Sequence, residues 1–236
     1  MIHHEPITRG LEDARYLRGQ LHRHRLQPCP EAGALIAELE QSLGLTLADL
    51  DTCFGPYPLF RAGRDNHTDL HRLLYALHQN LETHYLALCQ RVVSAMIREP
   101  CYVQAIPTYR FGLPGNRWVG SFHRDSDFGH CAYELNAICA LTSATGSAAL
   151  HVQQDPNGYS YERLELAAGE VILFDHIDRL HGCARNRSGR SVASIDFRYV
   201  PLRFQSEAFT AAASSINTRT PLVPGAYFRS EPLQPQ

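Results

Sequence analysis

The sequence has 236 residues, of which 44% are hydrophobic and 19% charged, and its 22 basic and 24 acidic side chains leave a net charge of −2. This is the composition of an ordinary soluble globular protein, and the balanced charge argues against a nucleic acid or an anionic membrane as partner. No apolar run approaches the ~20 residues of a membrane span, and the first residues lack the apolar stretch of a signal peptide. We therefore expect one cytoplasmic domain that comprises residues 1–236.

All 22 basic residues are arginines, because the sequence contains no lysine. Mechanisms that need an ε-ammonium group, such as Schiff-base catalysis or phosphate binding by a P-loop, are therefore excluded. The seven cysteines include no CxxC pair and are widely spaced. We predict reduced thiols rather than a disulfide framework or a structural zinc site.

The first hundred residues are predicted to be helical after a polar lead. One helix is expected over residues 31–43, where Gly44 ends it. A longer helix is expected over residues 68–97, because apolar side chains recur there at every third or fourth position. Asn66 or Thr68 is the expected N-cap of this second helix.

From residue 101 the pattern changes to short strand-like runs separated by Gly, Pro and Asn. The expected strands are 102–108, 133–141, 148–153, 163–166, 171–174 and 191–200. Their length and spacing predict a mainly β fold with helices, a jelly roll on which the N-terminal helical segment packs. We thus expect a helical part over 1–100, a β core over 101–203 and an irregular tail over 204–236 that covers the domain or acts as a lid.

A metal-binding pattern lies within the predicted β core. His123 and Asp125 are two residues apart, so on an extended strand their side chains point to the same side. His181 is the expected third ligand, because Gly182 after it permits close approach, and His176 is the alternative. Two histidines and one carboxylate on one face leave the other octahedral positions open, as non-haem Fe(II) oxygenases require.

The last predicted strand carries arginines on one of its two faces. With a period of two, residues 193, 195, 197 and 199 form a mainly apolar face, whereas Arg190, Ser194, Asp196 and Arg198 point to the other side. Guanidinium groups bind carboxylates through paired, charge-assisted hydrogen bonds. Arginines inside a β fold that holds Fe(II) therefore suit a dicarboxylate that also chelates the metal.

Several short motifs between about Pro107 and Pro201 extend this pattern. They are PGN at 114–116, FHRDSDFGH at 122–130, ELN at 134–136, ALT at 140–142, GEVILF at 169–174, HG at 181–182, Asn186 and SIDFR at 194–198. In these motifs the sequence resembles the Fe(II)/2-oxoglutarate-dependent dioxygenases of the phytanoyl-CoA hydroxylase-like superfamily, and within it a bacterial group that includes streptomycin-biosynthesis oxygenases. The resemblance implies a cupin-like double-stranded β-helix in which His123, Asp125 and His181 bind iron.

The resemblance also implies how 2-oxoglutarate is bound. An arginine of the last strand would hold its distal carboxylate, and Asn136 is expected to contact it. The family commonly places this arginine eleven residues after the distal histidine, where this chain has Val192. Arg190 and Arg198, nine and seventeen residues after that histidine, are therefore both candidates.

The activity implied by the resemblance is hydroxylation of an unactivated C–H bond in a small molecule. Fe(II), 2-oxoglutarate and O2 would be required, and succinate and CO2 would be the coproducts. The expected substrate is an amino acid, a peptide-derived or a sugar-like intermediate of natural-product biosynthesis, and no oligomeric state is predicted. Asp125 stands where related halogenases leave room for chloride, which favours hydroxylation, desaturation or cyclisation.

Other functions and other residues stay open on the sequence alone. A cupin-type metal-dependent isomerase or hydrolase is one alternative, and a non-catalytic binding module is another. Tyr109, Arg110, Arg117 and Arg124 lie on the segment that leads into the metal-binding motif. They are candidates for recognising a carboxylate or phosphate of the substrate.

Overall fold

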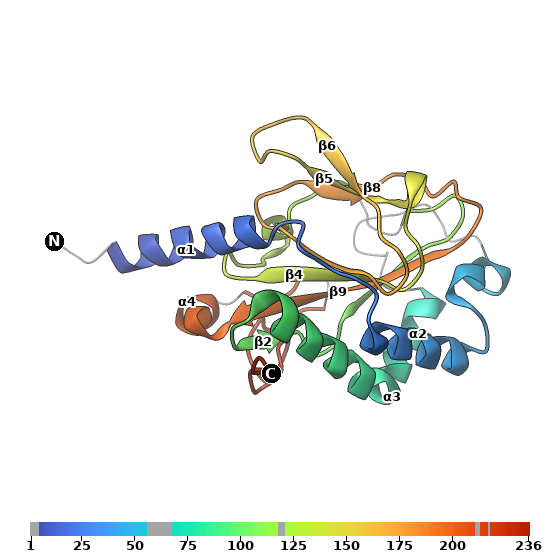
Figure 1. Cartoon of the computed structure of the whole chain (residues 1–236), viewed down its shortest axis with the longest axis horizontal. Helices are drawn as coiled ribbons and strands as arrows, with labels where there is room; N and C mark the ends of the chain where they lie inside the picture. The colour runs from blue at the N-terminus through green and yellow to red at the C-terminus, as the bar shows by residue number, and fades with distance from the viewer. Residues whose placement is uncertain (1–4, 56–67, 118–120, 211–212, 217) are drawn as a thin grey trace.

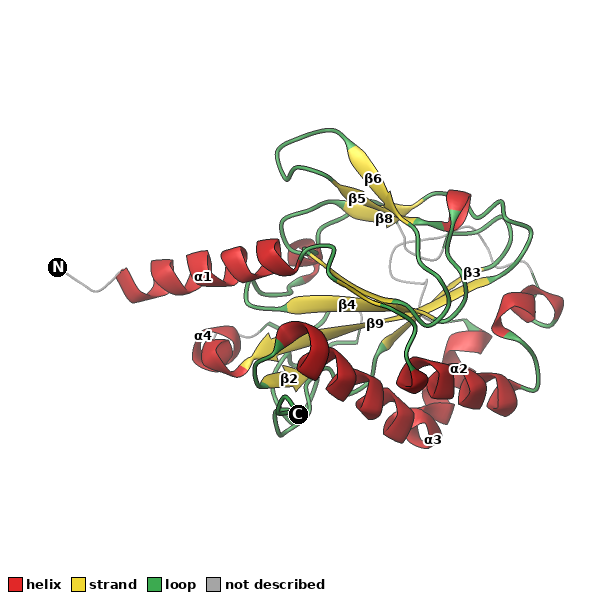
Figure 2. Ribbon diagram, viewed as in Figure 1, coloured by secondary structure: helices red, strands yellow, loops and turns green. Residues whose placement is uncertain are grey.

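Two antiparallel β-sheets face each other, and helices α2 and α3 cover the outer side of the larger sheet (Figures 1 and 2). The computed structural model describes residues 5–55, 68–117, 121–210, 213–216 and 218–236. The larger sheet has the order β1-β7-β4-β9-β2, with β3 also paired to β9, and the smaller sheet has the order β6-β5-β8. The strands are β1 (Arg25–Leu26), β2 (Cys101–Val103), β3 (Thr108–Gly112), β4 (Leu135–Ala140), β5 (Leu150–Gln153), β6 (Tyr161–Leu164), β7 (Val171–Phe174), β8 (His181–Cys183) and β9 (Val192–Pro201).

The helices begin and end at local signals in the sequence. Helix α2 has a proline in its first turn and ends at Gly44, whose φ of +68° is a left-handed conformation that glycine adopts without strain. Thr68 caps α3, because its hydroxyl accepts a hydrogen bond from the backbone N–H of His71; Asn66 lies outside the described residues. None of the described helices is long and apolar enough to cross a membrane. The α-helices are α1 (Glu5–Leu21), α2 (Pro30–Leu43), α3 (Asp69–Val92), which continues as a π-helical turn (Val93–Ile97), and α4 (Gln205–Thr210).

Helix α1 lies in the segment that the sequence analysis treats as a polar lead. Its first turns extend away from the sheets, and its last turns contact them (Figure 1). Only Ala14, Arg18 and Leu21 of its residues 9–21 are buried. A stripe this narrow, which includes an arginine, gives a weak apolar period, so the sequence alone does not reveal the helix.

Strand β9 separates two cores. Ala193, Ile195, Phe197 and Tyr199 are buried against α2 and α3, as the period of two predicts. The alternate side chains face the space between the two sheets, where a second apolar cluster fills one end. That cluster includes Ile138, Leu150, Leu164, Ile172, Cys183 and Val192. The other end of the same space is polar, and the candidate site lies there.

The C-terminal segment is docked on the domain. Leu233 and Phe228 form isolated β-bridges with Cys101 and Gln104, so the chain runs alongside β2 (Figure 1). Phe228 is fully buried, and Arg229 pairs with Glu82 of α3. Earlier in the segment, residues 213 and 214 lie against Gly129, at the end of the turn that begins with Asp125. The tail therefore covers the domain, and whether it also works as a lid stays a prediction.

Candidate metal centre

Three potential ligands converge at the polar end of the space between the sheets. The Nε2 atoms of His123 and His181 lie 3.4 and 3.3 Å from Oδ1 of Asp125. One ligand atom from each residue lies within 4.8 Å of the others, a spacing that one metal ion can bridge. The structure thus brings together the three residues that the sequence analysis assigns to iron.

Backbone pairing places these side chains. His123 and His181 exchange two backbone hydrogen bonds of 3.1 and 3.0 Å, so the segment around His123 adds to the smaller sheet beside β8. Asp125 begins a 3-10 turn (Asp125–Phe128), and its N–H donates to the carbonyl of His176 at 2.9 Å. The i, i+2 spacing works because Arg124 between the two ligands is extended.

Each histidine is oriented for metal binding by its second ring nitrogen. Nδ1 of His123 lies 2.7 Å from the carbonyl of Ser121, and Nδ1 of His181 lies 3.1 Å from the carbonyl of Arg179. A carbonyl can only accept, so Nδ1 carries the proton and Nε2 keeps its lone pair. Two imidazole nitrogens and one carboxylate oxygen form the donor set of a non-haem Fe(II) site.

His176, the alternative third ligand, is outside this cluster. It is fully buried in the loop before β8, and neither ring nitrogen has a hydrogen-bond partner. Burial lowers the pKa of His176 to about 3, so the ring is neutral at physiological pH. Within the described residues, the group of potential ligands comprises His123, Asp125 and His181 alone.

Gly182 permits the close packing that the sequence analysis expects of it. A Cβ at this position would lie 3.1 Å from the Cα and from ring atoms of Phe122. Phe122 is the neighbour of His123, so this contact lies directly beside the backbone pairing of the two histidines. A side chain at position 182 would push one ligand-bearing segment away from the other.

Arg198 contacts the candidate metal centre through Asp125. Its Nη2 donates to Oδ2 of Asp125 at 2.5 Å, and the side chain is only 4% exposed. Burial alone would raise the pKa of Asp125, but the positive charge of Arg198 and the two adjacent histidine rings hold that pKa well below its usual range. Asp125 is therefore ionised, with Oδ1 toward the histidines and Oδ2 toward Arg198.

A buried polar network surrounds Arg198 on its other sides. Nη1 donates to the Tyr227 hydroxyl at 3.0 Å and to Oε1 of Gln104 at 3.4 Å, and Nε faces Oε2 of Glu134 at 3.7 Å. Glu134 in turn pairs with Nδ1 of His130 at 2.8 Å. Burial would raise the pKa of Glu134, but His130 and Arg198 together lower it.

Sequence reasoning assigned no role to these four partners of the network. Glu134 and His130 do occur in quoted motifs, ELN and FHRDSDFGH, so the motif match was a usable signal. For Tyr227 the only signal was the aromatic character of the tail. Its contact with Arg198 depends on how the tail docks, which no local pattern shows.

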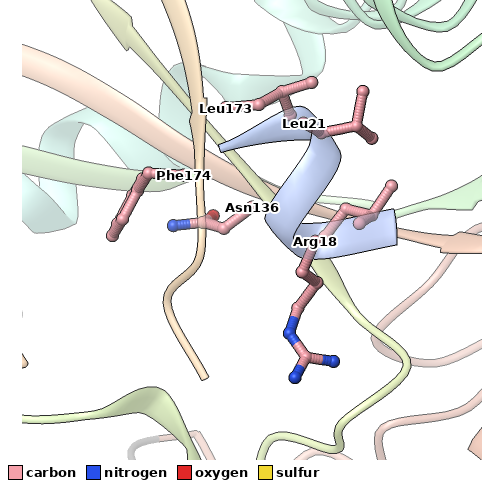
Figure 3. Close-up of a pocket in the computed structure, with 6 residues that line it drawn as sticks. Arg18, Leu21, Asn136, Leu173 and Phe174 are labelled. Carbon is pink, nitrogen blue, oxygen red and sulfur yellow. The ribbon is translucent and has the colours of Figure 1, made fainter. Parts of the chain in front are cut away.

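The residues expected to bind 2-oxoglutarate are placed differently from one another. Asn136 lies opposite Arg198 in the pairing of β4 with β9, and its Oδ1 is buried without a partner. It also lines a small cavity with Phe174 and Arg18 (Figure 3). Arg190 precedes β9 on the surface, with 65% of its side chain exposed, and pairs with Asp49. The structure does not bring Arg190 to the cluster, because the inward-facing strand begins only at Val192.

The four candidates for substrate recognition lie in different places in the structure. Arg110 on β3 binds Oδ2 of Asp196 through Nε and Nη2, at 3.4 and 3.1 Å. Arg124 donates to the carbonyls of Asp178 and Pro156 and to the side chain of Gln153, so it links two loops. Tyr109 is buried on the helix-covered side of β3, and Arg117 is exposed. Of the four, Arg110 is the one that faces the space between the sheets.

Known proteins resemble this chain in sequence and in fold. No protein-family profile matches the sequence. The chain is 36% identical to the streptomycin biosynthesis protein StrG of Streptomyces griseus over 137 residues, which are 58% of this chain and 65% of StrG. The aligned region thus spans slightly less than two thirds of that relative.

Solved structures share the fold at low sequence identity. The non-haem α-ketoglutarate-dependent epimerase SnoN from nogalamycin biosynthesis matches with a TM-score of 0.54 and 15% identity, over 94% of this chain and 98% of SnoN. The non-haem monooxygenase ThoJ matches with a TM-score of 0.51 and 14% identity, over 78% of this chain and 77% of ThoJ. The chain therefore shares with SnoN and ThoJ a fold of helices and antiparallel sheets.

Proposed function

We propose that this protein is a non-haem oxygenase that uses Fe(II), 2-oxoglutarate and O2 to hydroxylate an unactivated C–H bond of a small molecule. The observation that carries the proposal is the cluster of His123, Asp125 and His181, in which one potential ligand atom of each residue lies within 4.8 Å of the others. The likeness to StrG and the fold shared with SnoN support it. The strand orders suit a double-stranded β-helix, with the metal ligands on the smaller sheet and its edge.

The space between the sheets suits a polar cosubstrate beside the metal. Asn136 Oδ1 and Ser194 Oγ are buried there without hydrogen-bond partners, although buried polar groups in proteins are almost always satisfied. A ligand in this space would satisfy them. Arg198 and Arg110 are interior cations that could bind a carboxylate of 2-oxoglutarate. When bound, the metal and cosubstrate would supply the oxidising chemistry, and the protein would supply orientation and a dry site.

One interior atom points to the substrate rather than to the cosubstrate. Asp196 Oδ1 is buried without a partner, and its pKa is lowered by Arg110 and Arg198 against the opposing effect of burial. The ionised carboxylate needs a donor, which 2-oxoglutarate lacks. We therefore propose a substrate that carries hydroxyl or amino groups, in keeping with an amino acid or a sugar-like intermediate of natural-product biosynthesis.

The presence of Asp125 supports hydroxylation over halogenation, because the third protein ligand fills the position that chloride would need. A metal-dependent isomerase or hydrolase that works without 2-oxoglutarate is the alternative; SnoN, an epimerase of the same fold, depends on α-ketoglutarate and is not an example of it. These classes differ in whether 2-oxoglutarate is consumed. An oxygenase converts it to succinate, whereas an isomerase or hydrolase leaves it unchanged.

The test is anaerobic addition of Fe(II) and 2-oxoglutarate, followed by exposure to O2 and measurement of succinate. We expect a visible charge-transfer band before O2 is added, and slow succinate formation afterwards even without substrate. His181→Ala should remove both signals, and His84→Ala, at a half-buried position on α3, should change neither. Metal binding by the wild-type protein without the band and without succinate would exclude the oxygenase.

A further inference from the structure

Helix α1 reaches the interior of the domain through one buried cation, Arg18. The side chain is only 3% exposed, and Figure 3 shows it extending from α1 away from Leu21 and Leu173. Directly after the helix, the chain pairs with β7 through β1, so the C-terminal end of α1 is fixed to the larger sheet. Arg18 lies outside residues 107–201, in which the sequence resembles the dioxygenases, and the proposed function gives it no role.

The guanidinium group of Arg18 binds two segments that lead to the candidate metal ligands. Its Nε donates to Oδ1 of Asp175 at 3.1 Å and its Nη2 to Oδ2 of Asp178 at 2.7 Å, both in the loop between β7 and β8. Its Nη1 donates to the carbonyl of Ala132, in the segment that follows the turn begun by Asp125. Burial would raise the pKa of Asp175, but Arg18 holds it below its usual range, so both partners of this buried pair are charged.

The loop over residues 175–180 leads into one candidate ligand and supports another. His181 follows it directly, at the start of β8. Its carbonyls at 176, 177 and 178 accept three hydrogen bonds from the segment that carries the carboxylate ligand. The donors, in the same order, are the backbone N–H of Asp125 at 2.9 Å, the Ser126 hydroxyl at 3.1 Å and Nε of Arg124 at 2.9 Å. A shift of this loop would therefore move Asp125 as well as His181.

We propose that Arg18 is a positioning residue, which fixes the loop over 175–180 so that Asp125 and His181 stay close enough to share one metal ion. The inference rests on the proposed function, because the site to be positioned is its Fe(II) site. A planar guanidinium group that donates to two carboxylates and a carbonyl at once has one preferred geometry, and burial protects these bonds from competition with water. Helix α1 thus acts on the candidate metal centre without touching it.

Three variants separate positioning from stability. Arg18→Lys keeps the charge but replaces the planar fork with a compact ammonium group, which cannot span both carboxylates and the Ala132 carbonyl. Arg15→Gln is the matched control, because Arg15 lies about one turn earlier on α1 and reaches Oδ2 of Asp178 at 3.3 Å, but is 66% exposed. Leu74→Ala controls for lost stability, since Leu74 is buried on α3, on the outer side of the larger sheet.

Two measurements are made on each variant, at a temperature well below its Tm. Anaerobic calorimetry gives the Fe(II) affinity, and hydrogen–deuterium exchange of the metal-free protein gives the local opening of peptides that cover 121–130 and 175–183. We expect Arg18→Lys to weaken Fe(II) binding at least fivefold and to speed exchange in both peptides at least threefold relative to the rest of the chain. Arg15→Gln and Leu74→Ala should change Fe(II) affinity less than twofold and should not single out these peptides.

Asp178→Asn keeps the test decisive should Arg18→Lys not fold. This carboxylate is 28% exposed, and Arg18 keeps Asp175 as its charged partner in the variant. We expect Fe(II) binding to weaken at least threefold. Where both variants fold, their effects should combine to less than the product of the two, because they break the same interaction.

A folded Arg18→Lys or Asp178→Asn protein with wild-type Fe(II) affinity would overturn the inference. An equal loss of Fe(II) affinity in Leu74→Ala would overturn it too, because stability rather than position would then be the cause. Failure of the proposed function looks different: the wild-type protein would bind no Fe(II) or form no succinate. The exchange comparison is made without metal, so it would still accept or reject the fixing of the loop by Arg18.

Discussion

Replacing Gly182 with alanine tests how closely β8 packs on the segment that carries His123. A Cβ at position 182 would lie 3.1 Å from the Cα, Cγ and Cδ2 atoms of Phe122, whereas ordinary contacts are 3.4–4 Å. The neighbour must therefore retreat by a few tenths of an ångström. The Phe122 backbone cannot move alone, because the adjacent His123 exchanges backbone hydrogen bonds of 3.1 and 3.0 Å with His181.

The expected cost follows from two opposing effects. Overpacking a well-packed site costs about 1–3 kcal/mol. Replacing glycine with alanine in a regular element stabilises the fold by about 0.5–1 kcal/mol, because it lowers the conformational entropy of the unfolded chain. We expect Gly182→Ala to lower the free energy of unfolding by about 1–2 kcal/mol, which is about 2–8 °C in Tm for a chain of this size. Fe(II) affinity should fall as well, because His123 moves with Phe122.

Thermal and denaturant unfolding, with calorimetry for Fe(II), measure both effects. Gly33→Ala is the matched control, since Gly33 is exposed on α2 and a Cβ there meets nothing within 4 Å. It should raise stability by up to about 1 kcal/mol and leave metal affinity unchanged. If Gly182→Ala were as stable as the wild type and bound Fe(II) equally well, close packing would not be the reason for glycine at this position.

Three further outcomes are expected. His181→Ala should weaken Fe(II) binding more than a hundredfold and His176→Ala less than threefold in calorimetry; the reverse order would make His176 the ligand. Burial lowers the pKa of His176 to about 3 and that of His22 to about 4. Below pH 6.5 these two histidines therefore bind fewer protons in the folded protein than in the unfolded chain. The free energy of unfolding should fall by up to about 1.4 kcal/mol per pH unit per histidine as the pH drops toward 4. Urea unfolding at pH 7.5, 5.5 and 4.5 checks this, and His176→Leu should flatten the decline. Phe228→Ala should cost about 3–5 kcal/mol in the same assay, because the ring is 1% exposed in the core that anchors the tail; a loss below 1 kcal/mol would mean that the tail contributes little.

The elements that the sequence predicts well are those with a strong local period. Helices α2 and α3 end within a few residues of their expected limits, and β9 shows the alternation that its sequence indicates. Strands β1 and β8 have only two and three residues, too few for a period to be visible. The strand expected over 102–108 is wrong: the chain forms β2 over Cys101–Val103 and β3 over Thr108–Gly112, which pair with successive parts of β9. Such a division depends on the partner strand and not on the local sequence.

The convergence of His123, Asp125 and His181 was predictable, because residue types and spacing carry most of the information about it. The positions of the candidate carboxylate-binding arginines were harder to predict, because they depend on where β9 begins. Counting back from Arg198 by twos places Arg190 on the same face, but the regular strand starts at Val192 and the preceding bend turns Arg190 to the surface beside Asp49. Arg110 lies 86 residues from its partner Asp196, so only strand pairing reveals that the two meet.

Five buried charged groups around the candidate centre favour one order of binding. Asp125, Glu134 and Asp196 are buried carboxylates whose pKa values all lie below their usual range, and Arg198 and Arg110 are the arginines bound to them. These five groups carry one negative charge in excess, so a dianion meets net repulsion there while a divalent cation is attracted. With the cation in place the excess becomes positive, and the same dianion is favoured. The arrangement therefore favours metal before 2-oxoglutarate, because the residues that hold Asp125 ready for the cation leave the site unfavourable to the cosubstrate until the cation is bound.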